Sequence, residues 1–283
     1  MTDRRLRLLA ATEAEGDVLA GRLNDARVRI TLPTEPDWDH QVLLITLVDL
    51  LGRLFPRVTV DLASDFAAAG SLPPGPALLG DRVGEALANA GLPRPDGLGA
   101  SDEIVVRIGP ATSADRAHLH VDGRGWTSYL GSAPSRLPSE PSPPVSVGPV
   151  AAACRAAAAV TSRVLAPVST AAARAVAATP ASCYFSTLTY TVDTAPIWEP
   201  TVPASAIDAV LIGAGSVGGA AVYTLSYLPQ LSGRLTMVDP QQLEPHNPDR
   251  ALLATAAAAA AAAGYCKIDV AARALAHHEP GLS

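Results

Sequence analysis

The stretch Ile207-Asp208-Ala209-Val210-Leu211-Ile212-Gly213-Ala214-Gly215-Ser216-Val217-Gly218-Gly219 decides the fold of this chain. Its apolar residues up to Ile212 predict a buried strand, and the glycines that follow predict a tight turn into a helix. A second apolar strand, Leu235-Thr236-Met237-Val238-Asp239, comes next. This order of strand, glycine turn, helix and strand with a closing carboxylate is typical of a nucleotide-binding βαβ unit.

Each residue of the motif has its own expected task. Gly213 allows the turn, Gly215 lets the backbone approach a phosphate, and Gly218 lets the helix pack closely on the strand. The amide groups and the dipole at the helix N-terminus favour a bound anion. Asp239 stands where a carboxylate could accept hydrogen bonds from ribose hydroxyls. Taken alone, the motif leaves hydride transfer with NAD(P), another nucleotide, and a purely structural glycine turn as alternatives.

Polar residues behind the second strand favour a nucleotide with more phosphate charge. Asn247 and Arg250 follow Asp239 at short intervals, and Lys267 opens a later helical stretch. An arginine can fork onto phosphate oxygens, a lysine can act as a point charge beside it, and the asparagine amide can donate a hydrogen bond. A hydride-transfer site does not need this second cationic cluster. The alternative is that Arg250 and Lys267 are ordinary surface cations.

Together these residues resemble the adenylation domain of the ThiF/MoeB/HesA family, the bacterial relatives of the ubiquitin-activating enzymes. The resemblance covers about residues 205–283 and rests on Gly213, Gly215, Gly218, Asp239, Asn247, Arg250, Gly264, Lys267 and Glu279-Pro280. It implies that the glycines shape the nucleotide loop and that Asp239 holds the ribose. It also implies that Asn247, Arg250 and Lys267 hold the phosphates, with Arg250 and Lys267 as the catalytic cations.

The resemblance further implies an ATP- and Mg²⁺-dependent reaction. A ubiquitin-like or sulfur-carrier protein or peptide would be its partner, and the C-terminal carboxylate of that partner would become an acyl-adenylate with release of pyrophosphate. Members of this family are commonly dimers, so the chain is expected to form a homodimer. The family's magnesium-managing Asp, its cysteine and its CxxC pair would lie beyond Ser283, and residues 194–206 lack the arginine that often precedes the first strand. The alternatives are an NAD(P)-dependent oxidoreductase and a non-catalytic scaffold with a vestigial nucleotide fold.

The rest of the chain alternates strand and helix patterns, which predicts an α/β fold with a boundary near residue 200. Residues 1–200 are expected to form an α/β accessory or pseudo-adenylation domain, and residues 201–283 a Rossmann-like, incomplete nucleotide-binding unit with a pair of clear strands. The predicted strands are 27–32, 57–62, 102–109, 117–122, 126–130 and 187–192, and the predicted helices are 39–54, 81–90 and 150–165. In the first of these helices, Asp39, Asp49 and Arg53 are expected on the wetter side.

Two interpretations of residues 1–200 stay open. The helix opened by Gly148-Pro149 resembles a crossover helix of such adenylation domains, so the segment could be a degenerate repeat of the same fold without a glycine loop. An unrelated α/β domain that presents a substrate or partner is the alternative. The run Ala256–Ala263 has high helix propensity but no amphipathic face, and it adds nothing to this choice.

Composition excludes several classes of function. The 283 residues carry a net charge of −6, which gives no electrostatic reason to bind nucleic acid or an anionic membrane. The three cysteines are far apart without a CxxC pair, which disfavours disulfides and structural zinc and favours a reduced, cytoplasmic setting. The N-terminus has no apolar run of the signal-peptide kind. His118 and His120 share a strand face, but no third ligand is identifiable, so no metal site is predicted.

Overall fold

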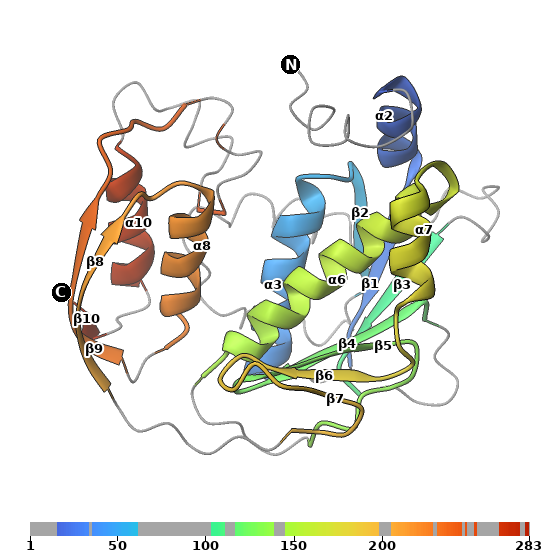
Figure 1. Cartoon of the computed structure of the whole chain (residues 1–283), viewed down its shortest axis with the longest axis horizontal. Coiled ribbons are helices and arrows are strands. Elements are labelled where there is room, and N and C mark those ends of the chain that lie inside the picture. Colours follow the sequence, from blue (N-terminus) through green and yellow to red (C-terminus); the bar gives the residue numbers. More distant parts are fainter. Residues whose placement is uncertain are drawn as a thin grey trace.

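The computed structural model describes residues 16–33, 36–61, 103–110, 117–138, 145–197, 205–228, 231–244, 247, 252–253, 266–277 and 281–282. Within them the chain forms two sheets (Figure 1), and we call residues 16–197 the N-terminal unit and residues 205–282 the C-terminal unit. Helices and strands alternate in a mixed parallel and antiparallel arrangement, so the fold class is α/β, as predicted.

The described strands of the N-terminal unit form a seven-stranded sheet with the order β2-β1-β3-β4-β5-β6-β7. The pairings β2·β1, β1·β3 and β3·β4 are parallel, and the pairings β4·β5, β5·β6 and β6·β7 are antiparallel. The strand bounds are β1 Arg27–Thr31, β2 Arg57–Asp61, β3 Glu103–Ile108, β4 Leu119–Arg124, β5 Thr127–Gly131, β6 Cys183–Ser186 and β7 Val192–Asp193. The predicted strands from 27 to 130 are therefore confirmed, and the hairpin turns at Gly125, whose φ is +54°.

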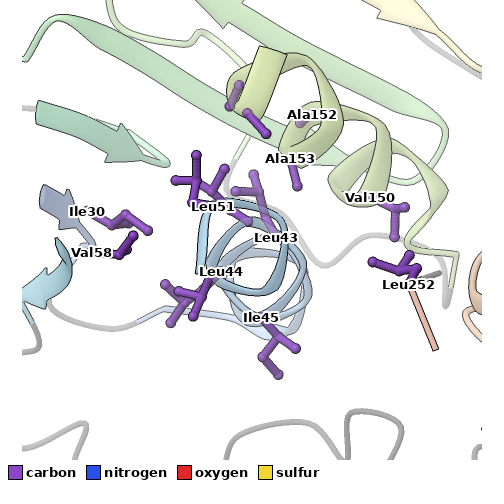
Figure 2. Close-up of a cluster of buried hydrophobic side chains, with 14 of the residues drawn as sticks. Ile30, Leu43, Leu44, Ile45, Leu51, Val58, Val150, Ala152, Ala153 and Leu252 are labelled. Carbon is purple, nitrogen blue, oxygen red and sulfur yellow. The ribbon is translucent and has the colours of Figure 1, made fainter. Parts of the chain in front are cut away.

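Helices pack on this sheet because their apolar residues face it. The described helices of the unit are α2 Gly16–Asp25, α3 Trp38–Gly52, α6 Val147–Leu165, the short 3₁₀ helix η1 Ala166–Val168 and α7 Thr170–Ala177. Ala152 and Ala153 of α6 are fully buried, and their small side chains let α6 approach α3 closely. Figure 2 shows α3 end-on between these alanines and the strand residues Ile30 and Val58.

The expected wetter side of α3 is wrong. Asp39 is 3% exposed, Asp49 is 0% exposed and Arg53 is 7% exposed. The sheet, α6 and the C-terminal unit together cover this helix, so even its polar side chains lie inside. Burial of charge is costly unless the group is paired. Asp49 pairs with Arg53, and Asp39 accepts a hydrogen bond from the Ser146 hydroxyl and lies 3.6 Å from Nη1 of Arg124.

The predicted strand 187–192 is also wrong. Strand β6 ends at Ser186, and the chain turns before the two residues of β7. The Ser186 hydroxyl accepts hydrogen bonds from the amides of Leu188 and Thr189, and Tyr190 adopts a positive φ of 58°. Hydroxyl side chains that bond to nearby backbone amides favour turns over strands, which explains why this β-branched run is not extended.

The described strands of the C-terminal unit form a three-stranded parallel sheet with the order β10-β9-β8. Its elements are β8 Ser205–Ile212, α8 Ser216–Leu225, β9 Leu231–Val238, α10 Lys267–His277 and β10 Gly281–Leu282. The predicted strand, helix and strand of the glycine motif are confirmed, but the expected burial of the first strand is wrong. Val210 is 64% exposed and Ile212 is 82% exposed, because α8 and α10 lie on the other side of the sheet. The expected pair of strands is too few, because β10 extends the sheet beyond β9. Figure 1 shows α8 and α10 between this sheet and the N-terminal unit.

The two units share a single hydrophobic core that includes residues of α3, α6 and α8. Both contain a strand, a helix and a neighbouring parallel strand, namely β1-α3-β2 and β8-α8-β9. This βαβ unit is the topology that the two described sheets have in common. It is too little to test the repeat hypothesis, which stays a prediction. The predicted helix 81–90 and the run Ala256–Ala263 lie outside the described residues. None of the helices in the described part of the chain is long and apolar enough to cross a membrane.

Candidate functional site

The glycine loop between β8 and α8 has the geometry that its sequence predicts. Gly213 has a φ of +91°, a conformation that L side chains rarely adopt. A Cβ added to Gly218 would lie 1.8 Å from the carbonyl oxygen of Gly213, so the helix can turn over the strand only with glycine there. Gly215 is the N-cap of α8, and a Cβ added to it would meet nothing within 4 Å. The open side of the loop therefore leaves room for a phosphate in front of the helix N-terminus.

Asp239 is tied directly to this loop. Its Oδ2 accepts a hydrogen bond of 2.7 Å from the amide of Ala214, and its Oδ1 accepts one of 2.8 Å from the amide of Gln241. The amide of Gly213 donates to the carbonyl of Val238 at 2.8 Å, which closes the end of the sheet. A carboxylate oxygen can accept a further hydrogen bond, so Asp239 keeps acceptor capacity for a hydroxyl while it fixes the loop.

Lys267 reaches the same edge of the sheet through one intermediate residue. Its Nζ donates to Oε1 of Gln241 at 2.5 Å, and its amide donates to the carbonyl of Gln241 at 3.1 Å. The side chain is buried, and its Nζ donates to a neutral amide rather than to a carboxylate. Lys267 therefore keeps a positive charge that no described carboxylate pairs with, one residue away from Asp239 in the hydrogen-bond network.

Asn247 is 1% exposed and holds its own turn. Its side-chain Oδ1 accepts a hydrogen bond of 3.0 Å from the backbone amide of Glu244, and its backbone amide donates one of 2.9 Å to the carbonyl of Glu244. This use of Oδ1 leaves the side-chain NH₂ group as a donor. Arg250 and Gly264 lie outside the described residues, as does Glu279-Pro280. Within its described part, the structure thus brings together the glycine loop, Asp239 and Lys267.

A second polar cluster lies in the N-terminal unit, and the sequence reasoning did not find it. We call Asp37, Asp39, His40, Asp122 and Arg124 the switch-point cluster. They gather at the N-terminus of α3 and the carboxyl end of β4, near Gly109, which follows β3. Helix α3 leads from β1 to β2, whereas β3 lies on the other side of β1. Such a switch point is where open α/β sheets usually bind their ligands.

The cluster fills this place with its own side chains. Asp37 caps α3 by accepting from the amide of His40 at 3.1 Å, and it also pairs with Arg124. His40 Nδ1 lies 2.9 Å from Asp37 Oδ1, and His40 Nε2 lies 3.5 Å from Asp122 Oδ1. A Cβ added to Gly109 would come within 2.5 Å of His40 Nε2, so the ring is closely packed. A carboxylate of the protein thus occupies the helix N-terminus where a phosphate would bind in a nucleotide site.

The signal for this cluster was present in the sequence. The run Asp37-Trp38-Asp39-His40 opens the apolar helix, and Asp122 with Arg124 lies in the predicted hairpin. Only the parallel order of β1, β3 and β4 brings these segments to one edge. The cluster is an ion-pair network, and in the part of the chain that the structure describes, no group of three or more His, Cys, Asp or Glu could hold a metal ion.

Comparison with known proteins places the N-terminal unit in a family. Residues 27–180 match the family model described as the BilD N-terminal domain. The chain belongs to this family. A search of the curated proteins finds no match. The matched residues run from β1 to just past α7, so the BilD N-terminal domain contains the switch-point cluster but not the glycine loop.

Burial and charge shift the pKa values of the cluster in the BilD N-terminal domain. Burial raises the pKa of Asp39 to about 6, although the hydroxyl of Ser146 donates to its Oδ1 at 2.7 Å. For His40, burial alone would lower the pKa, but the hydrogen bonds to Asp122 and Asp37 and their negative charges outweigh it and raise the pKa above 6.5. Burial opposes ionisation of Asp37 as well, but His40 and Arg124 hold its pKa well below 3.8.

These shifts predict that stability falls as the pH rises from 4 to 7. Asp39 has a higher pKa in the folded chain (about 6) than its ordinary 3.8, so its contribution is complete below 3.8 and lost as the pH rises through 6. The difference corresponds to roughly 3 kcal/mol. His40 acts in the same direction above its ordinary value of 6.5. Asp37, with its lowered pKa, loses stability only when the pH falls below 3.8.

Urea denaturation at pH 4, 5, 6 and 7 measures this dependence. The variant Asp39→Asn keeps an acceptor for Ser146 but cannot ionise, so the decline between pH 4 and 6 should disappear and stability at pH 7 should rise. An unchanged decline in the variant would show that other groups cause it.

Proposed function

We propose that the C-terminal unit anchors ATP for the adenylation of a C-terminal carboxylate. The substrate would be a ubiquitin-like or sulfur-carrier protein or peptide, and the products an acyl-adenylate and pyrophosphate. One observation carries this proposal: a series of hydrogen bonds joins Ala214 of the glycine loop to Asp239, Asp239 to Gln241, and Gln241 to Lys267. It links the buried Lys267 to the carboxylate that fixes the glycine loop.

The chemistry assigns a separate task to each group. A carboxylate oxygen of the substrate attacks the α-phosphorus, the bond from that phosphorus to the β-phosphate bridging oxygen breaks, and pyrophosphate leaves with both electrons of that bond. Lys267 stabilises the charge that moves toward the leaving group, and Arg250 is proposed to fork onto the same phosphates. Asp239 accepts from the ribose, and the side-chain NH₂ group of Asn247 donates to a phosphate oxygen. Mg²⁺ would enter with the triphosphate and screen its charge.

Nucleotide binding separates this proposal from its alternatives. ATP with Mg²⁺ should raise the melting temperature of the chain, because a ligand that binds only the folded state stabilises it. Stabilisation by NAD⁺ but not by ATP would favour the oxidoreductase, and no effect of either nucleotide would favour the scaffold. Exchange of labelled pyrophosphate into ATP that depends on an added carrier protein would establish the chemistry. Self-association into a homodimer and a cytoplasmic location are parts of the same proposal.

Lys267→Met is expected to weaken ATP binding about tenfold to a hundredfold. A hydrogen bond to a charged group contributes roughly 1.5–3 kcal/mol, and each 1.4 kcal/mol changes a dissociation constant tenfold. Titration calorimetry measures the affinity directly. Arg273→Met is the matched control, because it removes one positive charge from an exposed position of the same helix α10. Equal affinities of the two variants for ATP would remove Lys267 from the site.

A further inference from the structure

We propose that Arg53 of the N-terminal unit is a positioning residue of the nucleotide site. It would hold the segment 252–253, which lies against the first turn of α8, in place from the opposite side of the unit boundary. This inference rests on the proposed binding of ATP and names a residue far outside the resemblance that suggested it. Arg53 is the C-cap of α3, one turn after Asp49.

The guanidinium group of Arg53 makes contacts in two directions. Its Nε and Nη2 donate to Oδ2 of Asp49 at 3.0 and 2.7 Å. The same Nη2 donates to the carbonyl oxygen of Leu252 at 2.8 Å. Asp49 thus fixes the orientation of the planar fork, and the fork fixes a backbone carbonyl two residues after Arg250.

Apolar contacts connect the anchored segment with the glycine loop. Leu252 and Leu253 are both buried. Figure 2 shows Leu252 beside Val150 at the start of α6. On the other side, a Cδ atom of Leu253 lies 4.0 Å from the position that a Cβ on Gly219 would take, in the first turn of α8. The segment therefore lies between the N-terminal unit and the helix whose N-terminus the phosphates would approach.

Helix α3 also holds α8 itself. Thr46 Oγ1 and Tyr223 Oη are 2.8 Å apart, and Tyr227 Oη donates to Tyr223 Oη at 3.2 Å. Thr46 and Arg53 are thus anchors on one rigid helix, one for α8 and one for the segment 252–253. Their separation along α3 sets the position of the segment 252–253 relative to α8.

A purely structural ion pair would make the same contacts, but its replacement would not change the affinity for ATP. Replacing a buried ion pair by apolar residues of similar size often leaves a protein as stable or more stable. The double variant Asp49→Leu/Arg53→Met therefore separates the two roles. We expect it to melt at or above the temperature of the unmodified chain without nucleotide, yet to bind ATP at least tenfold more weakly. Arg53→Lys, which can still donate to the Leu252 carbonyl, should recover part of that loss.

Two measurements on the whole chain test this role. Titration with Mg·ATP gives the affinities, and hydrogen exchange reports the protection of the Leu252 and Leu253 amides, which should fall in the double variant. Arg29→Met is the control: Arg29 pairs with Asp61 and Glu103 within the N-terminal sheet, so its loss should change neither measurement.

The outcomes separate this inference from the proposed function. Unchanged ATP affinity in the double variant would overturn the positioning role while leaving ATP binding intact. If the unmodified chain binds no ATP, the adenylation proposal falls, and the role of Arg53 in nucleotide binding falls with it. Hydrogen exchange then decides whether Arg53 anchors the segment at all, and unchanged protection would overturn the anchor too.

Discussion

Gly218→Ala is expected to destabilise the C-terminal unit by at least about 3 kcal/mol, the upper end of the usual cost of overpacking, and to abolish ATP binding. The added Cβ would lie 1.8 Å from the carbonyl oxygen of Gly213 and 2.9 Å from its carbonyl carbon. Both atoms belong to backbone, so no side-chain rotation can relieve the contact. Either α8 moves away from β8 or the loop opens, and both changes remove the cradle of amides in front of the helix.

A neighbouring glycine provides the matched control. A Cβ on Gly219 would meet Ala214 and Leu253 only at 3.7 and 4.0 Å, which is ordinary van der Waals contact. Because alanine favours helix over glycine, Gly219→Ala should stabilise α8 by up to about 1 kcal/mol. Chemical denaturation of the two variants should therefore give opposite changes in stability. ATP titration measures the loss of binding that is expected for Gly218→Ala. Similar stabilities would mean that the close approach of α8 to β8 does not exist in solution.

Arg124→Met is expected to cost about 3–5 kcal/mol at pH 8, the usual effect of removing one partner from a buried charge network. The arginine contacts Asp37, and its Nη1 lies 3.6 Å from Asp39 Oδ2. The Oδ2 atom of Asp39 is buried and accepts no hydrogen bond from the described residues, so the arginine is its main compensation. Without Arg124, the negative charge of an ionised Asp39 would be buried and would lack the guanidinium group that now compensates it.

The pH dependence of this loss identifies its cause. At pH 5 Asp39 is largely protonated, because burial raises its pKa to about 6, so the cost of Arg124→Met should be smaller there than at pH 8. Urea denaturation at the two pH values measures the difference. The surface variant Arg174→Met, on an exposed position of α7, should change little at either pH. Equal losses at both values would show that lost packing of the arginine side chain, rather than charge, destabilises the variant.

Local sequence patterns were sufficient to predict the fold where one segment alone determines its own structure. The strand, glycine turn and helix around Gly213 were predictable because each residue there meets a requirement of its own neighbours. The burial of Asp49 was not, because it depends on Arg53 one turn away and on Leu252 near the other end of the chain. The strand predicted at 187–192 failed for a local reason, since hydroxyl groups bond to the backbone and stabilise a turn.

In the candidate site, too, some residues could be predicted from the sequence and others could not. Asp239 and Lys267 could be named from their spacing, but Gln241, whose backbone amide contacts Asp239 and whose side chain contacts Lys267, carries no signal of its own in the sequence. The switch-point cluster needs the sheet order, because Asp37 and Arg124 come together only when β1, β3 and β4 lie side by side. Placement of charges from distant segments is therefore the part that sequence reasoning could not reach.

The contact between Arg53 and Leu252 also governs the order of events during synthesis. It joins residues separated by 199 positions, so it can form only after Leu252 has left the ribosome. Domains usually fold from the N-terminus as they emerge, and contacts of such long range form late because chain entropy opposes them. The large sheet with α3 and α6 can thus be complete beforehand. Helix α8 and Leu252 can then pack on this preformed unit, and the proposed ATP site would form after it.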